Sequence, residues 1–262
     1  MPLKAFIITQ EDCLYLPRFI QTVARQRRAN IVGMTILPAL MPKQTWLGTM
    51  RDHLEVYGPT QFLKQGFRYA WRRGLALLQG WLPLSEPYSV RRVAENYDLP
   101  LRDTANVNSK EYLDFLRSLD LDLIISINAS QKFKSEILAL PRLGCINVHG
   151  ALLPRYRGRL PSFWVLANGE RETGATVHFM NEDLDDGPIL LQEAVAIEPS
   201  DTQDTLIQKT KSTGARLIVE AIDRLEKGAP KTQLNDRSQA TYFSFPTRED
   251  GRRLRQQGRR FL

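Results

Sequence analysis

Short apolar runs alternate with longer amphipathic stretches along most of the chain. The short runs are typical of buried strands and predict them at residues 4–9, 31–37, 122–127, 145–148, 176–179 and 189–194. Apolar positions spaced three and four residues apart predict helices at residues 14–27, 109–119 and 204–224. Ser109 is a candidate N-cap for the second of these helices, and Asp201 or Thr202 for the third. Because strands and helices alternate, we expect an α/β fold with a Rossmann-like, mostly parallel sheet and helices on both faces.

Composition places the chain among ordinary globular proteins. Its 262 residues are 42% hydrophobic and 25% charged, which excludes a disordered, collagen-like or coiled-coil architecture. No apolar run approaches the roughly 18 residues of a membrane-spanning helix, and acidic residues follow the first strand too early for a signal peptide. We therefore expect a cytoplasmic protein with one domain over residues 1–228 and a short basic extension over residues 229–262.

Several common chemistries lack their sequence signatures. The first predicted strand leads into Glu11 and Asp12 instead of a glycine-rich turn, and two acids there would repel a dinucleotide pyrophosphate. The chain contains no phosphate-binding loop, zinc-protease helix or serine-hydrolase elbow motif. Cys13 and Cys145 form no CxxC pair, so neither a disulfide framework nor a thiolate zinc site is expected, and we predict no metal.

The strongest chemical candidates lie at the end of the strand predicted around residue 147. Of only three histidines, His149 directly follows this strand-like segment. Because side chains alternate along a strand, Asn147 and His149 project from the same face. This face lies at the carboxyl end of the strand, where open α/β sheets place their ligands. An amide donor and an imidazole are therefore expected to share one binding surface.

A carboxylate can complete this pair. Asp185 lies in a loop where Gly187 permits unusual backbone dihedrals and Pro188 stiffens the exit into the next strand. From there it could hold the imidazole of His149 in one tautomer and raise its pKa. Such a set suits acyl transfer to an amine, because no serine or cysteine nucleophile is placed beside the histidine.

Two segments carry a family resemblance. The runs LGCINVHGALLPRYRG (143–158) and LDDGPILLQ (184–192) resemble the signature blocks of formyltransferases that use 10-formyltetrahydrofolate. This family includes methionyl-tRNA, glycinamide ribonucleotide and sugar-nucleotide N-formyltransferases, and the resemblance is close over about residues 106–226. It implies the family fold, direct attack of an acceptor amine on the formyl carbon, and Asn147, His149 and Asp185 as catalytic residues. It also implies 10-formyltetrahydrofolate as co-substrate, bound by Ile125, Ile127, Ala129, Asp183, Leu184 and Gly187.

Other polar residues near these segments have two interpretations each. Arg155 and Arg157, together with Arg159, either bind an anionic group of the acceptor or of the folate, or are solvated loop residues. His178 either binds substrate at the site or packs in the core. Asp186 is expected to be a solvated loop acid, and His53 an exposed helix residue.

Residues 58–83 form an insertion that the simplest family pattern does not explain. Apolar side chains recur there at helical spacing, and the segment carries four basic residues and no acid. Such a helix either lies on the anionic inner surface of a membrane, or packs on its own domain or on a second subunit in a homodimer. We favour packing.

The acceptor is expected to be a small molecule. Residues 240–251 resemble the ending of sugar-nucleotide formyltransferases, and too few residues follow the last predicted helix for the barrel domain of transfer-RNA enzymes. We expect an amino sugar carried on a nucleotide or a lipid. The basic tail lacks interleaved aromatic residues, so nucleic-acid binding is not expected. The alternatives are a methionyl-tRNA formyltransferase without the barrel, a formyltetrahydrofolate hydrolase, and a non-catalytic folate or nucleic-acid binder.

Overall fold

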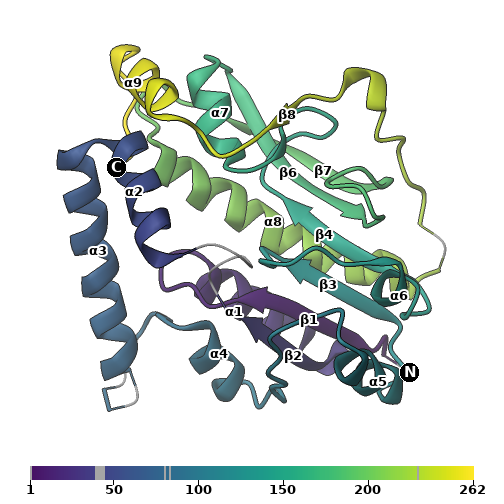
Figure 1. Ribbon diagram of the computed structural model, residues 1–262. Coiled ribbons are helices and arrows are strands. Elements are labelled where there is room, and N and C mark those ends of the chain that lie inside the picture. Colours follow the sequence, from purple (N-terminus) through teal and green to yellow (C-terminus); the bar gives the residue numbers. More distant parts are fainter. Residues whose placement is uncertain (1, 39–44, 80, 83, 229) are drawn as a thin grey trace.

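The centre of the protein is a six-stranded sheet with the order β2-β1-β3-β4-β6-β7 (Figure 1). The computed structural model describes residues 2–38, 45–79, 81–82, 84–228 and 230–262. The strands are β1 (Ala5–Gln10), β2 (Ile31–Leu37), β3 (Leu123–Ile127), β4 (Cys145–His149), β6 (Glu172–Phe179) and β7 (Ile189–Ala196). The first four strands in the sheet order, β2, β1, β3 and β4, are parallel to one another. Strand β6 runs antiparallel to β4, and β7 runs antiparallel to β6. The predicted mostly parallel sheet is confirmed.

Helices cover both faces of this sheet because its strands are apolar on both sides. Ala5 and Ile7 face one core, which contains α1 (Leu16–Arg27), α4 (Val90–Asn96) and α8 (Gln203–Glu226). The alternate residues Phe6 and Ile8 face a second core with α5 (Lys110–Ser118) and α6 (Ser135–Leu138). A strand buried on both faces reads as a continuous apolar run, which is the pattern that predicted these strands.

The predicted helix caps are present. The hydroxyl of Ser109 accepts a hydrogen bond from the backbone N–H of Tyr112 at the start of α5. At the start of α8, Thr202 accepts from the N–H of Thr205, whose hydroxyl in turn accepts from the N–H of Thr202. Each cap satisfies N–H groups that lack a partner within the helix.

A third core joins helix α2 to the C-terminal end of the chain. It lies among α2 (Trp46–Tyr57), α7 (Pro161–Ala167) and α9 (Arg248–Gln256), and the ring of Phe261 contacts those of Tyr57 and Phe163. Nearby, β5 (Arg157–Gly158) pairs with β8 (Tyr242–Phe243), and the chain also forms short 3-10 helices at Arg28–Asn30 and Arg237–Gln239. The basic extension therefore packs against the domain and pairs with the loop that follows β4.

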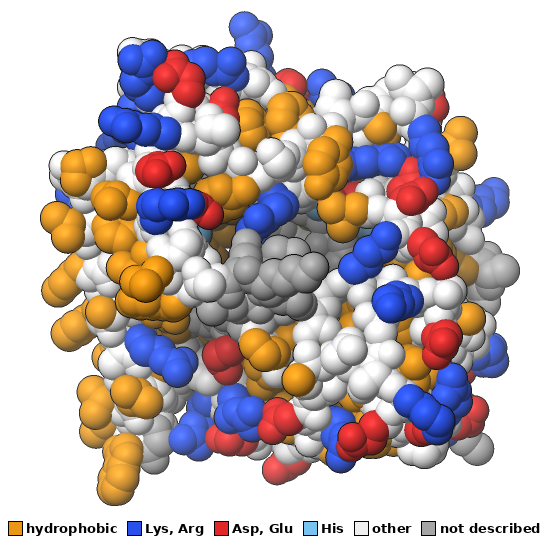
Figure 2. All heavy atoms as spheres, viewed as in Figure 1, with side chains coloured by type: hydrophobic (Ala, Val, Ile, Leu, Met, Phe, Trp, Pro, Cys, Tyr) orange, Lys and Arg blue, Asp and Glu red, His pale blue; other side chains and the backbone are white. Residues whose placement is uncertain are grey.

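Helix α3 (Pro59–Leu78) stands at the edge of the molecule beside α2 (Figure 1). None of its residues is buried, and Figure 2 shows hydrophobic side chains gathered along this edge. The expectation that its apolar stripe packs on its own domain is wrong, because the stripe faces solvent while Arg68 and Arg72 face the domain. Residues 80 and 83 of the predicted insertion lie outside the described residues. No helix among the described residues has the length and apolarity to cross a bilayer.

Candidate active site

A cleft of about 590 Å³ opens at the carboxyl ends of β1, β3 and β4. The chain moves from β1 to β2 on one side and returns to β3 on the other, so the strand order reverses beside β1. Ligands of open α/β sheets bind at such a reversal, because the loops on either side diverge and leave a crevice. Asn147, His149 and Asp185 all line this cleft, as the sequence pattern predicts.

The structure brings the three predicted catalytic side chains together with a second histidine. Oδ2 of Asp185 lies 3.5 Å from Nδ1 of His149, and its Oδ1 lies 3.7 Å from Nε2 of His178. The amide nitrogen of Asn147 lies 3.3 Å from the same Nε2 of His178. His178 is therefore part of the cluster, buried between Asn147 and Asp185.

Backbone carbonyls determine where both imidazoles carry a proton. Nε2 of His149 lies 2.7 Å from the carbonyl oxygen of Tyr156, which can only accept, so this nitrogen donates. Nδ1 of His178 likewise donates to the carbonyl of Phe179 at 2.8 Å. The nitrogen through which His149 can exchange a proton with a ligand is therefore Nδ1, which faces Asp185.

Three hydrogen bonds from two residues hold Asp185 and its loop in place. Asp185 has a left-handed backbone conformation with φ 53°, which turns its carboxylate back toward β4. The N–H of Gly158 donates to its Oδ2 at 2.9 Å. The side-chain amide of Asn235, in the C-terminal extension, donates to the carbonyls of Asp185 and Gly187 at 2.9 and 3.0 Å. These bonds fix the carboxylate before any ligand binds.

The environment keeps Asp185 ionised. Burial opposes its charge, but His149, His178 and the N–H of Gly158 outweigh burial and hold the pKa of this carboxyl well below its ordinary value. The ionised carboxylate lies beside Nδ1 of His149. The cluster can therefore donate from Asn147, stabilise negative charge with His149, and balance that histidine with Asp185.

Asp186 and Arg157 differ from expectation. Asp186 is buried, and it pairs with Nη1 of Arg157 at 2.5 Å and with Arg237. Burial opposes its ionisation, but these arginines and the amide of Asn181 lower its pKa to about 2. Asp186 is thus an internal structural acid, and the expectation of a solvated loop acid is wrong. Arg157 also bonds the side chain of Asn235, so its guanidinium is committed within the fold.

The other predicted arginine does not reach the cleft either. Arg155 is exposed and lies 3.4 Å from Glu170. Of the three arginines after β4, Arg159 is the one that lines the cleft, with its guanidinium over the ring of Phe245 at 5.0 Å.

The predicted folate residues divide between the cleft and the core. Ala129, Asp183 and Leu184 line the cleft. Ile125 and Ile127 instead point into the core under α1 and α8, because strand side chains alternate and the cleft side of β3 is occupied by Ser126.

Gly187 lies beneath the loop and is also absent from the cleft lining. A Cβ atom on it would lie 2.0 Å from the carbonyl oxygen of Phe179, so its place in the sequence reflects close backbone packing.

Several cleft residues were missed by sequence reasoning. Lys211 lines the cleft from α8, with Nζ 3.4 Å from Oδ1 of Asn128, and burial lowers its pKa to about 8 although Asp12 opposes this shift. His53 of α2 also lines the cleft and is half-buried, so the expectation of an exposed helix residue is wrong; its Nδ1 lies 2.7 Å from the carbonyl oxygen of Thr49. Helical spacing offered one signal for Lys211, because Gln203, Ile207 and Lys211 recur every four residues and share one face of α8.

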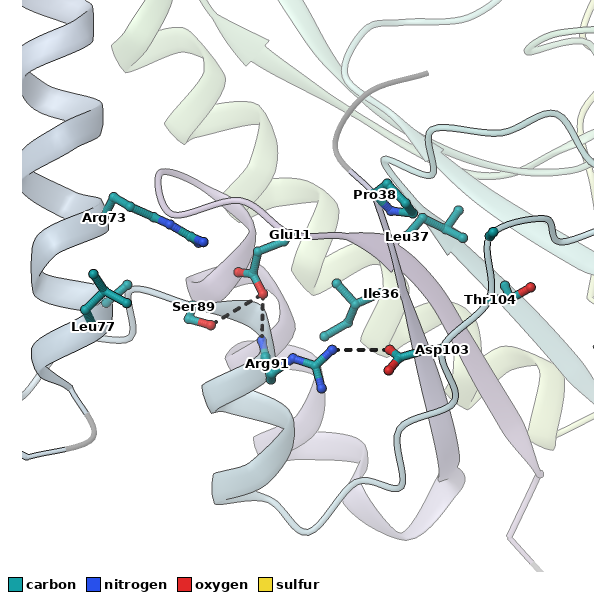
Figure 3. Close-up of a pocket in the computed structure, with 12 residues that line it drawn as sticks. Glu11, Ile36, Leu37, Pro38, Arg73, Leu77, Ser89, Arg91, Asp103 and Thr104 are labelled. Atoms are coloured by element: carbon teal, nitrogen blue, oxygen red, sulfur yellow. Dashed lines mark hydrogen bonds and ion pairs between the residues drawn. The ribbon is translucent and has the colours of Figure 1, made fainter. Parts of the chain in front are cut away.

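A second cavity, of about 750 Å³, lies between β2 and α3 (Figure 3). Three of the charged side chains that line it, Glu11, Arg91 and Asp103, serve internal contacts. The carboxylate of Glu11 accepts from the N–H groups of Val90 and Arg91 at the start of α4, and the guanidinium of Arg91 lies 3.2 Å from Asp103. Because Glu11, Arg91 and Asp103 already have partners within the fold, the cleft beside His149 is the better candidate for chemistry.

Comparison with known proteins agrees with this site. The site combines a half-buried amide, two buried imidazoles and a buried carboxylate at the switch point of an α/β sheet, and these groups suit proton and acyl transfer. Residues 79–222, more than half of the chain, match the family model described as formyl transferase. The chain therefore belongs to the formyltransferase family.

Curated relatives include methionyl-tRNA formyltransferases. That of Thermotoga maritima is 38% identical over 164 residues, which are 63% of this chain and 52% of the relative. That of Kosmotoga olearia is 40% identical over 164 residues, with 63% and 53% coverage. The chain thus spans about half the length of the curated relatives it matches.

Solved structures share the fold. A sugar N-formyltransferase from a Shewanella species has a TM-score of 0.58 and 20% identity, covering 92% of this chain and 76% of its own. Phosphoribosylglycinamide formyltransferase from Anaplasma phagocytophilum has a TM-score of 0.62 and 14% identity, covering 93% and 100%. An N-formyltransferase from Helicobacter canadensis, solved with folinic acid and dTDP-3-aminofucose, has a TM-score of 0.58 and 16% identity, covering 92% and 71%.

Proposed function

We propose that the protein is an N-formyltransferase that moves a formyl group from 10-formyltetrahydrofolate to the primary amine of an amino sugar carried on a nucleotide or a lipid. The observation that carries this proposal is the convergence of Asn147, His149 and Asp185 in one cleft. Membership of the formyltransferase family supports the choice of donor.

The proposed reaction is a direct transfer. The acceptor nitrogen attacks the formyl carbon, the bond from that carbon to N10 of the folate breaks, and a proton lost by the acceptor nitrogen ends on N10. The products are a formamide and tetrahydrofolate, and no enzyme acyl group forms.

Each side chain then has a defined task. Asn147 donates its amide N–H to the formyl oxygen and stabilises negative charge as it develops there. His149 adds electrostatic stabilisation and relays the proton through Nδ1, since its other nitrogen is held by Tyr156. Asp185 positions His149 and balances its charge, while His178 holds the amide of Asn147.

The remaining cleft surface suits two ligands that meet at this cluster. One side, formed by Ala129, Asp183 and Leu184, is the side we assign to the folate. Elsewhere the lining includes the cationic groups of Arg159 and Lys211 and the ring of Phe245. An acceptor that carries both a ring and phosphates fits this chemistry. The neighbour from Helicobacter canadensis was solved with ligands of these two kinds.

Release of tetrahydrofolate, followed by absorbance, tests the proposal. Release that requires an amino-sugar nucleotide supports transfer, release in water alone indicates a hydrolase, and no release with any acceptor indicates a binding module. His149→Ala should abolish turnover while folate binding, measured by calorimetry, stays within a few-fold. Turnover that persists in this variant within a few-fold would reject the assigned role of His149.

Methionyl-tRNA is a second candidate acceptor. Relatives that act on it, according to their names, are 38% to 40% identical to this chain over 63% of its length. Formylation of methionyl-tRNA and of an amino-sugar nucleotide should be compared at equal enzyme concentration. Binding of the transfer RNA should also weaken steeply with salt if several phosphates are contacted. A transfer-RNA rate above the sugar rate would replace our first choice.

A further inference from the structure

An ordinary surface helix packs its apolar face on the domain, whereas α3 turns its basic face toward the domain. Arg68 lies 2.6 Å from Asp204 and stacks over the ring of Tyr15, and Nε of Arg72 donates to the carbonyl of Cys13 at 2.8 Å. These contacts turn the basic face of the helix toward the domain. Its apolar face must then point away from the domain, into solvent.

This outward face is a ridge of large apolar side chains, which we call the α3 ridge. It consists of Leu63, Phe67 and Trp71, followed by Trp81 just beyond the end of the helix. Phe67 and Trp81 are 73% and 89% exposed. The neighbouring helix α2 adds exposed Trp46 and Leu47, so three of the four tryptophans are exposed on α2, on α3 or just after α3. Figure 2 shows hydrophobic side chains gathered along this edge. A monomeric protein rarely leaves so much contiguous apolar surface in water, and the ridge therefore marks a docking surface.

The charges beside the ridge indicate which partner docks on it, a second copy of this chain or a membrane surface. At about 100° per residue, exposed Lys64 falls on one border of the ridge, whereas Arg73, on the opposite border, lines the cavity between β2 and α3 (Figure 3). The segment 58–83 contains no acid. In a two-fold dimer each copy presents the same surface, so a second α3 ridge would bring only further positive charge. A bilayer with anionic headgroups supplies the missing negative charge.

The side-chain types favour the same occupant. Helices that lie in a membrane interface bury leucine, phenylalanine and tryptophan on one face and place basic residues at its borders. Tryptophan is enriched at the headgroup level because one edge of the ring is polar. We propose that the α3 ridge docks the protein on an anionic membrane surface. This inference does not depend on the proposed activity.

Co-sedimentation of the full chain with vesicles tests the proposal. Wild type should pellet with vesicles of phosphatidylcholine and phosphatidylglycerol, and much less with phosphatidylcholine alone. Trp71→Glu and Phe67→Glu should weaken this binding by at least about tenfold, because each puts a charge where apolar contact is needed. Leu234→Glu, at an 83% exposed leucine outside the ridge, is the matched control and should bind as wild type does.

Sedimentation velocity without lipid completes the experiment. The substituted ridge residues are exposed, so thermal unfolding should be unchanged and loss of binding is not loss of fold. Absence of pelleting by wild type, or equal pelleting of wild type and Trp71→Glu, overturns the proposal. A wild-type dimer that Trp71→Glu splits, with no vesicle binding, identifies a second copy as the occupant and also overturns it.

Discussion

Replacing Asp185 with asparagine removes one charge from the cluster and keeps its shape. The variant Asp185→Asn still offers an oxygen to the N–H of Gly158, which now lies 2.9 Å from Oδ2. What it loses is the negative charge 3.5 Å from Nδ1 of His149. At an effective dielectric constant of about 20, a full charge pair at that distance is worth about 5 kcal/mol. If the imidazole gains about half to three quarters of a charge in the transition state, the barrier rises by about 2.5–4 kcal/mol.

The expected kinetic result is a fall of about 10²–10³ in kcat with KM within a few-fold, because the change acts on the transition state. Formyl transfer to the amine acceptor, followed by tetrahydrofolate release, measures it. Retention of kcat within about threefold in a folded Asp185→Asn protein would refute the reasoning.

Stability supplies an independent check on the same side chain. The pKa of Asp185 is lower in the folded protein than its ordinary value of 3.8, so ionised Asp185 stabilises the fold above that pH. This contribution is lost as the pH falls through the folded pKa. The difference in the free energy of unfolding between wild type and Asp185→Asn should therefore be largest near neutral pH and narrow below about pH 4. A difference that does not change with pH would contradict the assigned ionisation.

Further predictions concern Asp186 and Lys211, near the cluster, and Phe261 of the C-terminal extension. Asp186→Asn, in the same loop, should lower the free energy of unfolding, measured in urea, by about 3 kcal/mol because it leaves Arg157 buried without its carboxylate. The kcat of this variant should stay within a few-fold of wild type. A large loss of kcat at full stability would argue against a structural role for Asp186 and a catalytic role for Asp185. Lys211 has a lowered pKa of about 8, so its charged form disfavours the folded state and the free energy of unfolding should rise from about pH 8 to 10. The free energy of unfolding of Lys211→Met should accordingly exceed that of wild type by about 1–2 kcal/mol at pH 7, and the difference should disappear at pH 10. Equal free energies of unfolding at pH 7 would count against a desolvated lysine. Phe261→Ala should cost about 3–4 kcal/mol, since its buried ring contacts Tyr57 and Phe163, and a loss under 1 kcal/mol in urea would mean that the C-terminal extension is not docked.

The regular part of the fold follows from local pattern. Residues 31–37 and 122–127 are apolar on both faces, which is a sufficient sign of strands in a covered parallel sheet. Caps such as Ser109 and Thr202 act through neighbouring residues, so sequence suffices to find them. The helix α7 escaped prediction because it has seven residues, almost all apolar and buried, and thus shows no amphipathic period.

Within the candidate site, too, features set by local pattern could be predicted, whereas features set by tertiary contacts could not. Asn147 and His149 are two residues apart on one strand, so their shared face can be predicted. The commitment of Arg157 to Asp186 and Asn235 depends on a segment 78 residues further along the chain, which no local pattern reveals. Ile125 and Ser126 differ by one position, and only the packing of α1 and α8 decides which of them faces the cleft.

The outward orientation of α3 is a tertiary property for the same reason. Its amphipathic period is visible in the sequence, but the period alone leaves the direction of each face open. Contacts of Arg68 and Arg72 with Asp204 and Cys13 determine that direction.

Mass spectrometry of an amino-sugar nucleotide incubated with isotope-labelled 10-formyltetrahydrofolate tests most directly whether Asn147, His149 and Asp185 serve one transfer. Wild type should place one labelled formyl group on the acceptor amine, and Asn147→Ala and His149→Ala should each remove this product without unfolding. Labelled formate without labelled acceptor, or unchanged product in both variants, would contradict the transfer and the site assigned to it.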